Sequence, residues 1–229
     1  MPVARLLGEE RKLVVAYWLG RLKDLPASAD RPLEKRLTVR DDGLLTLDLS
    51  GTKIADLAPL AGMPLGELNL LGCGEIADFA PLRELRSLTS LELGRTRIGD
   101  LSPLRGLPLV ELRLASTRVS DISPLRGMPL KELVLWNTHV TDFSPLAGMP
   151  LATFSSAGNP ATDYSPLKGA PLDVCVIQDS QVSDLSFLDG SPVRDLSLYG
   201  CDAARGFAVL GGLKSLRVLV LPQSYYDRL

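Results

Sequence analysis

Apolar and polar residues alternate over short runs that recur at a fixed interval along most of the chain. Each run carries an apolar–polar–apolar step, and the first apolar residue of the step returns after 21 or 23 residues. Alternation with a period of two indicates a β-strand with one buried face. A repeat of about 20–30 residues indicates a solenoid rather than a globule. Nine copies begin at Leu47, Leu68, Leu91, Leu112, Leu133, Phe154, Cys175, Leu196 and Leu219.

A small hydrogen-bonding residue stands three positions after the second apolar residue of each step. We expect this residue to end the strand, bend the chain inward and satisfy backbone groups of neighbouring turns. Thr117 and Thr138 are therefore predicted to be buried and hydrogen-bonded to adjacent repeats. We call these positions the ladder, and they are Thr52, Cys73, Thr96, Thr117, Thr138, Asn159, Ser180 and Cys201, with Ser224 in the last copy.

The second half of each copy predicts a short turn that returns the chain to the next strand. An Asp precedes Ser-Pro-Leu or a variant of it, and Asp or Ser as a cap with Pro at the first helical position starts a turn. Gly-Met-Pro or its equivalent ends that turn at once, so the return leg should be 3₁₀ or irregular. The 23-residue copies, which begin at Leu68 and Leu196, are predicted to have longer legs. The Asp residues are Asp56, Asp78, Asp100, Asp121, Asp142, Asp163 and Asp184.

Residues 1–43 precede the repeats and are predicted to cap them. Apolar residues near helical spacing predict a helix over residues 3–25, followed by a loop. Asp42-Gly43 between two alternating runs indicates a hairpin, so a strand near residues 37–40 should pair antiparallel with the first repeat strand. Residues 44–229 then form nine repeats of the same structural unit. The helix has two alternative interpretations, a docking element for a partner and, more weakly, a signal peptide.

The pattern L-x-L-x-x-T/N/C-x-I-x-D-L-x-P-L resembles the leucine-rich repeat, in particular the internalin-like bacterial class. The Gly-Met-Pro-Leu variant is similar to repeats of large bacterial multidomain proteins, some of which carry Ser/Thr kinase domains. The resemblance implies an α/β fold, a right-handed solenoid with a parallel β-sheet on the concave face and short convex legs. It also implies protein binding, and it leaves the partner open because solenoids bind different proteins. The sequence contains no kinase signature, so kinase activity is not implied for this chain.

Composition narrows the classes of function. A net charge of −2 gives no general attraction to nucleic acid or anionic lipid, and no apolar run is long enough to span a membrane. Cys73 and Cys201 would lie six strands apart, about 29 Å, which is too far for a disulfide. Reduced thiols predict a cytoplasmic protein. His139, the one histidine, has no nucleophile and orienting acid beside it, so we expect no catalysis, cofactor or metal.

Outward-facing residues should form columns on the concave face. Trp136 and Tyr199 share a column three strands apart, about 14 Å, and flank small residues, as interface hot spots do. Six acids and one base, Arg113, occupy the two neighbouring columns, and Arg113 is expected to pair with Glu92. The candidate partner-binding residues are Trp136, Tyr199, Arg113, Glu111, Glu132, Val134, Gln178 and Ser155.

Each surface feature also has a simpler interpretation. Adjacent acids of the sheet repel weakly and could form a solvated face, and single exposed aromatic residues are common. A basic rim follows the ladder, and its side chains could also be merely solvated; spacing and lack of interleaved aromatics argue against nucleic acid. The rim residues are Lys53, Arg97, Arg118 and His139.

Two parts of the array depart from the pattern. In the copy that begins at Phe154, Ser156 replaces an inward Leu; either Phe154 and Tyr164 refill the volume, or local stability was traded for a site. After the last strand we expect no amphipathic helix or extra hairpin to cover the last turn. Tyr225, Tyr226 and Leu229 would then fold back over Leu219 and Leu221 as a lid, or the end would associate with another molecule.

The chain is therefore predicted to be a non-catalytic protein-interaction module that binds a partner on its concave face. The alternative is a regulatory or scaffolding subunit of a larger assembly, such as a kinase or toxin system, that uses its rim or its ends. Edge association through the C-terminal repeat would fit that alternative.

Overall fold

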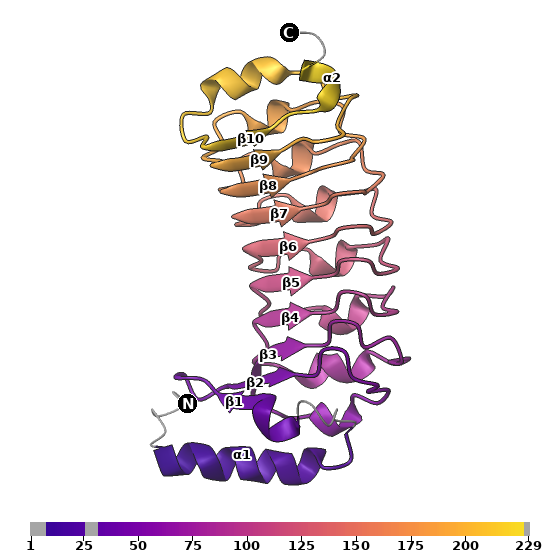
Figure 1. The fold of residues 1–229 in the computed structure, drawn as a ribbon, viewed down its shortest axis with the longest axis vertical. Helices are drawn as coiled ribbons and strands as arrows, with labels where there is room; N and C mark the ends of the chain where they lie inside the picture. The colour runs from indigo at the N-terminus through magenta and orange to yellow at the C-terminus, as the bar shows by residue number, and fades with distance from the viewer. Residues whose placement is uncertain (1–7, 26–31, 227–229) are drawn as a thin grey trace.

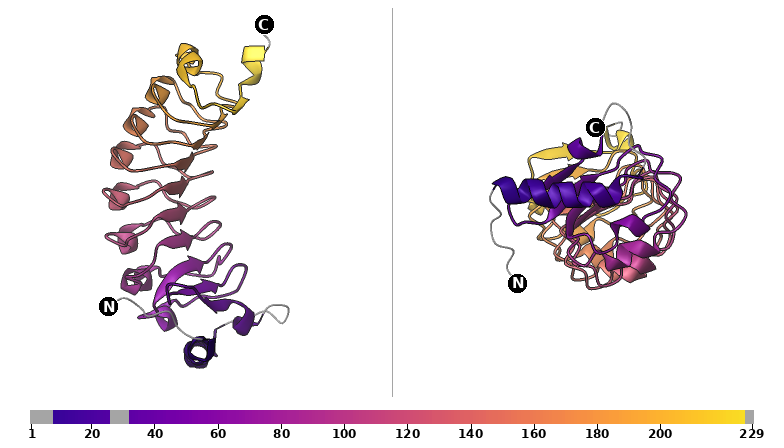
Figure 2. Two further views of the ribbon diagram at one scale, coloured as in Figure 1. Left: turned by 90° about the vertical axis from the view of Figure 1, so that its left-hand side faces the viewer. Right: turned by 90° about the horizontal axis from the view of Figure 1, so that it is seen from below.

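Ten short strands form one continuous sheet in the computed structural model, which describes residues 8–25 and 32–226. The strands follow chain order, and neighbours from β2 to β10 are parallel. They stack along the long axis of the molecule (Figure 1) and line the inner side of its curve, with the return legs on the outer side (Figure 2). The expected solenoid is confirmed. Its parallel strands are β2 (Leu45–Asp48), β3 (Leu65–Asn69), β4 (Ser90–Glu92), β5 (Glu111–Arg113), β6 (Glu132–Val134), β7 (Thr153–Ser155), β8 (Val174–Val176), β9 (Asp195–Ser197) and β10 (Val218–Val220).

The first strand runs opposite to the others. β1 (Leu37–Val39) pairs antiparallel with β2, with Leu37 opposite Leu47. The connecting turn places Gly43 at φ 83°, and its N–H donates to the carbonyl of Arg40 at 3.1 Å. Glycine adopts this left-handed conformation without steric cost, which explains the Asp-Gly pair. The expected antiparallel capping strand is confirmed.

A helix lies across the end of the sheet beyond β1 (Figure 1). α1 (Gly8–Leu22) buries Trp18 but leaves Leu13 71% and Tyr17 60% exposed. The expected start at residue 3 lies outside the described residues. The helix ends three residues before the expected position 25, in keeping with Pro26, which disfavours helical geometry in the residue before it.

The return legs are single 3₁₀ turns, as expected. In the 21-residue copies a turn spans three residues, as in η5 (Ser123–Leu125). The 23-residue copies have η3 (Ala80–Glu84), of five residues, and η9 (Phe207–Gly212), of six, so the added residues lengthen the convex leg. The other turns are η1 (Leu33–Lys35), which belongs to the cap, η2 (Ala58–Leu60), η4 (Ser102–Leu104), η6 (Ser144–Leu146), η7 (Ser165–Leu167) and η8 (Ser186–Leu188).

The repeated Asp was expected at the N-cap position of the 3₁₀ turn that follows it. It lies one residue before that position. Oδ1 of Asp121 accepts the backbone N–H of Ser123 at 2.7 Å, and Oδ2 accepts its hydroxyl at 3.0 Å, while Ile122 between them is the cap. The carboxylate therefore bridges over the cap and satisfies the first N–H of the turn. Such hydrogen bonds from the following serine lower the pKa of Asp100, Asp142 and Asp184.

The ladder residues from Thr52 to Cys201 are all buried, whereas Ser224 in the last copy is half-buried. The hydroxyl of Thr117 donates to the carbonyl of Leu114 at 2.7 Å, within its own repeat, so the expected bond to an adjacent repeat is wrong for this residue. The inward bend at the strand end brings the carbonyl three residues back within reach. The cysteines differ, because the thiol of Cys73 donates to the carbonyl of Leu49 in the preceding repeat at 3.0 Å, and Cys201 makes the equivalent contact.

The core is less covered at the C-terminal end. The anchor Leu133 is fully buried, whereas Leu219 is half-buried. A single helical turn, α2 (Gln223–Tyr226), begins three residues after the end of the last strand. Pro222 precedes this helix, where its missing N–H costs nothing. The side chains of the proposed lid, which are those of Tyr225, Tyr226 and Leu229, lie outside the described residues.

Candidate functional site

The outward side chains of the sheet line up across neighbouring strands. Glu111 lies opposite Glu132 and Arg113 opposite Val134, so equivalent positions of successive repeats are adjacent at about 4.8 Å. The same register continues from β3 to β10. This register confirms the alignment of the copies from which the columns were derived.

Arg113 is at the centre of a charged cluster on β5 and β6. Its guanidinium donates to Oε1 of Glu132 at 2.7 Å and lies 3.7 Å from Oε2 of Glu111. The expected pair with Glu92 is therefore wrong. Arg113 bridges two carboxylates that would otherwise repel each other across neighbouring strands.

Glu92 is instead held by its own strand end. Its Oε1 accepts the backbone N–H of Gly94 at 2.6 Å. Partial burial raises the pKa of this carboxyl, while the Gly94 N–H and the charge of Arg113 oppose that effect. Glu92 therefore satisfies a backbone donor of its own strand end, while the hydrogen bond of Arg113 goes to Glu132 in the next repeat.

Trp136 is the anchor of a second cluster, on β6 and β7. Its side chain is 46% exposed, and its indole N–H donates to the hydroxyl of Ser155. Ser155 is itself buried and donates to the carbonyl of Val176 at 3.3 Å. The indole is thus fixed by a hydrogen bond at one edge while much of its ring faces solvent.

Gln178 and Tyr199 continue this column toward the C-terminus. The amide of Gln178 donates to the hydroxyl of Ser197 at 2.6 Å, which orders the side chain along the sheet. Tyr199 is 52% exposed. The structure therefore gathers the predicted residues in two clusters, one charged around Arg113 and one beginning at Trp136, with the half-buried Val134 lying between them on β6.

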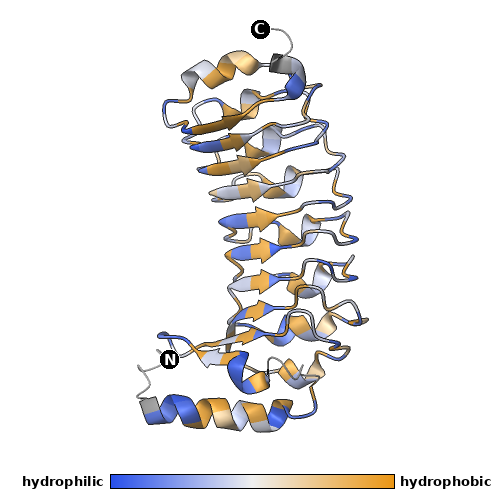
Figure 3. Ribbon diagram, viewed as in Figure 1, coloured by the Kyte–Doolittle hydropathy of each residue, from blue (hydrophilic) through white to orange (hydrophobic). Residues whose placement is uncertain are grey.

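Sequence reasoning did not assign the outward valines of the last strands to the site. Val218 is 52% and Val220 37% exposed, and Val174 and Val176 are half-buried. Hydrophobic residues fill all of β8 and β10 (Figure 3). The signal was present in the sequence, since valine occupied both outward positions of these strands where earlier copies have polar residues. The concave face is thus charged at β3 to β6 and largely apolar at β8 and β10.

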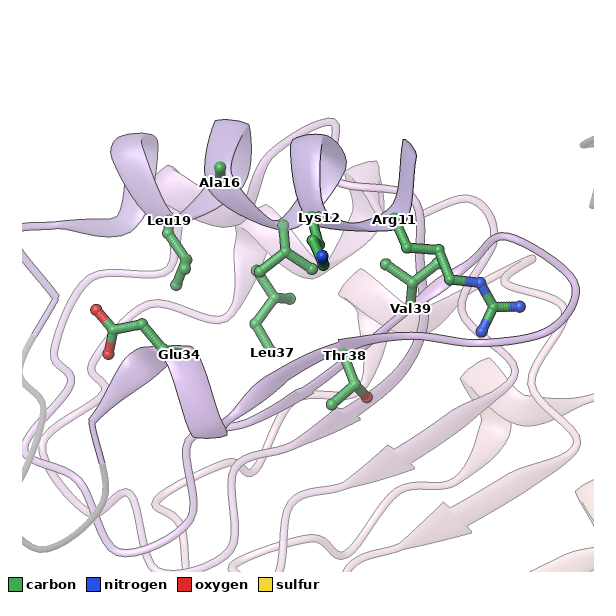
Figure 4. A pocket seen from close by; sticks show the side chains of 9 residues that line it. Arg11, Lys12, Ala16, Leu19, Glu34, Leu37, Thr38 and Val39 are labelled. Carbon is green, nitrogen blue, oxygen red and sulfur yellow. The ribbon is translucent and has the colours of Figure 1, made fainter. Parts of the chain in front are cut away.

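An apolar groove of about 460 Å³ lies between α1 and β1, at the N-terminal end and away from these clusters (Figure 4). Leu19 contributes to its helix wall and Leu37 and Val39 to its strand wall, while Arg11 and Glu34 stand at its margins.

In the part of the chain that the structure describes, no three His, Cys, Asp or Glu side chains converge as a metal site would require. None of its helices combines the length and hydrophobicity needed to cross a bilayer.

Solved structures resemble this chain, although no family model and no curated protein matches it. An internalin (inlF) from Listeria monocytogenes is similar in structure, with 30% sequence identity and a TM-score of 0.63 over 74% of this chain. Another internalin (inlC2) from the same species gives 27% identity and a TM-score of 0.52 over 62% of this chain and 74% of its own. The chain spans about half, 52%, of the length of the first. The repeat pattern, the parallel sheet, the 3₁₀ legs and these likenesses show that the chain folds as a leucine-rich repeat solenoid similar to those of the two internalins.

Proposed function

We propose that the chain is a non-catalytic protein-interaction module that binds a partner protein on its concave face. Solenoids of stacked repeats present extended concave surfaces suited to this use. The likeness to internalins supports a binding role in general, and the partner contacts are proposed from this chain's own side chains.

The observation that carries the proposal is the Trp136 cluster. Trp136 and Tyr199 are both about half exposed in one column three strands apart, a separation of about 14 Å. The bond from Trp136 to Ser155 fixes one ring before binding, so little side-chain entropy is lost when a partner covers it. Large, ordered, half-exposed aromatic residues are typical hot spots of protein interfaces.

The charged cluster contributes orientation rather than affinity. Glu111, Arg113 and Glu132 form a half-buried network on β5 and β6, and ion pairs that remain open to solvent add little energy. Charges at the margin of an interface mainly set the association rate and reject wrong partners. A partner that covers the Trp136 cluster would therefore place its own polar residues toward β5.

The test is capture of a partner from the native cell with Trp136→Ala, followed by measurement of its affinity. We expect a loss of about 2 kcal/mol or more, with the unfolding midpoint nearly unchanged. Tyr17→Ala is the matched control, because Tyr17 is a comparably exposed aromatic residue on α1. Equal effects of the two changes, or binding that survives Trp136→Ala, would exclude the concave face.

A second candidate is a scaffolding role through the edge of β10, where Val218 is exposed and Leu219 half-buried. Within the described residues β10 pairs only with β9, and an apolar edge strand can template pairing with another chain. The occupant proposed is a second copy of this chain. Sedimentation velocity should show a concentration-dependent dimer that Val218→Lys abolishes, and a monomer at all concentrations would exclude the pairing.

A further inference from the structure

A row of basic residues follows the ladder along the edge where the strands end, which lies on the right-hand side of Figure 1. The side chains of Lys53, Arg97, Arg118 and His139 are exposed while the ladder residues before them are buried. Backbone hydrogen bonds hold the loops in register, since Arg118 N–H donates to the carbonyl of Ile98 at 3.0 Å. These residues are therefore spaced by the repeat, at about 5 Å between neighbouring loops.

The structure adds a fifth member, Arg95, which the sequence did not single out. It stands just before the ladder residue of its copy, at φ 55°, where equivalent positions include Gly51 and Gly72 and also Ser116, which has a positive φ as well. Its side chain is exposed, as are those of the four rim residues.

The five basic residues lack internal partners. Among the residues that the structure describes, none of them makes an ion pair or a side-chain hydrogen bond. The basic side chain on the sheet behaves differently, because Arg113 is engaged by two carboxylates. The charge of the rim is thus available to a ligand.

A hollow of about 570 Å³ opens among Lys53, Arg95 and Arg97. It exists because the intervening copy places Gly74 at the position where its neighbours carry Lys53 and Arg97. A side chain at Gly74 would meet no atom within 4 Å, and this glycine is not in the left-handed region that would require it. Glu75 also lines the hollow, so its wall holds three cations and one carboxylate.

We infer that this rim hollow binds an acidic segment of a protein partner through its carboxylates. Ammonium and guanidinium groups form charge-assisted hydrogen bonds with carboxylates. A peptide suits the site better than a nucleic acid, because its carboxylates can pair with the three cations without the stacking contacts that bases require. None of the lining residues is aromatic, so bases would find no stacking platform.

The test uses fluorescein-labelled octaglutamate, with octaglutamine as the neutral probe, and fluorescence anisotropy at about 50 mM salt, where screening is weaker than at physiological salt. Lys53→Gln/Arg95→Gln/Arg97→Gln should weaken octaglutamate binding about tenfold, because each exposed ion pair contributes a few-fold. The matched control is Arg105→Gln/Arg126→Gln/Lys168→Gln, which removes the same three charges from exposed positions on the convex legs. It should change affinity by less than about twofold.

Three results would overturn the inference. These are no binding of octaglutamate to the unaltered protein, equal losses in the two triple variants, and displacement by inorganic phosphate or an octathymidylate as effective as by unlabelled octaglutamate. Unfolding midpoints of both variants should match that of the unaltered chain. Trp136→Ala should leave octaglutamate binding unchanged, so this inference and the concave-face proposal can fail separately.

Discussion

The regular copies, which begin at Leu112 and Leu133, and the two copies after them solve the same packing problem in different ways. In the regular copies every inward strand position is leucine, and all four of these side chains are fully buried. In the irregular copies Phe154 lies opposite Cys175, so a larger side chain adjoins a smaller one. The side-chain volume of the core is therefore balanced between neighbouring repeats and is not the same at each position.

The buried polar groups of the irregular copies also compensate each other. Ser156 replaces an inward leucine and is fully buried, and its hydroxyl lies 3.0 Å from the hydroxyl of Tyr164. The Tyr164 ring packs against Phe143 at 5.1 Å and Phe187 at 5.7 Å between centroids. The tyrosine fills the missing volume and the serine satisfies its hydroxyl, which supports repacking over the exchange of stability for a site.

The largest expected effect comes from forcing an irregular copy back toward the regular pattern at one position. Ser156→Leu should destabilise the protein by about 3 kcal/mol, because it overpacks the site and strips the Tyr164 hydroxyl of its partner. Ser156→Leu/Tyr164→Ile gives the pair of the copy that begins at Leu112, where Leu114 and Ile122 stand, and should recover at least half of that loss. The measurement is urea unfolding of both variants. A double variant as unstable as the single one would contradict the coupling.

How far the sequence alone could predict this molecule depends on the range of each interaction. Strand positions and register followed from the repeat, because a buried face with a period of two allows no slip by one residue. The clusters around Arg113 and Trp136 could be located to neighbouring strands for the same reason.

The partner of each long or polar side chain was harder to predict. Arg113 could reach carboxylates on both neighbouring strands, and it bonds to Glu132 while Glu92 accepts the Gly94 N–H. Thr117 bonds to a carbonyl of its own repeat, whereas Cys73 at the equivalent position bonds to one of the preceding repeat. The Ser156–Tyr164 contact was signalled only by two off-pattern residues in one copy, and the bond itself depends on how the rings pack.

A change of intermediate size in unfolding free energy is expected where the regular copies adjoin the irregular ones, at Thr138. The hydroxyl of Thr138 lies 3.0 Å from both the Leu135 carbonyl and Oδ1 of Asn159, and that oxygen also accepts the Thr138 N–H at 2.9 Å. Thr117 has only the contact to Leu114. Thr138→Val should therefore cost about 2 kcal/mol and Thr117→Val about 1 kcal/mol in urea unfolding. Equal costs would mean that Asn159 adds nothing to the ladder.

The smallest expected effect concerns a group that the regular copies lack. Full burial raises the pKa of the Cys175 thiol from 9.0 to about 12, whereas a leucine anchor does not titrate. Below pH 9 the thiol is protonated in the folded and unfolded chains alike, so its contribution to stability is complete. Above pH 9 the unfolded chain ionises first, and stability falls as pH rises toward 12.

Cys175→Ala isolates this contribution, because Cys73 and Cys201 remain in both proteins and shift in the same direction. Between pH 8 and pH 10 the unaltered chain should lose about 1.4 kcal/mol more unfolding free energy than the variant, since each pH unit in the window is worth about that amount. The measurement is urea unfolding of both proteins at the two pH values. Equal losses would mean that Cys175 ionises as readily in the folded chain as in the unfolded one, and that its burial in the irregular copies contributes no pH dependence to stability.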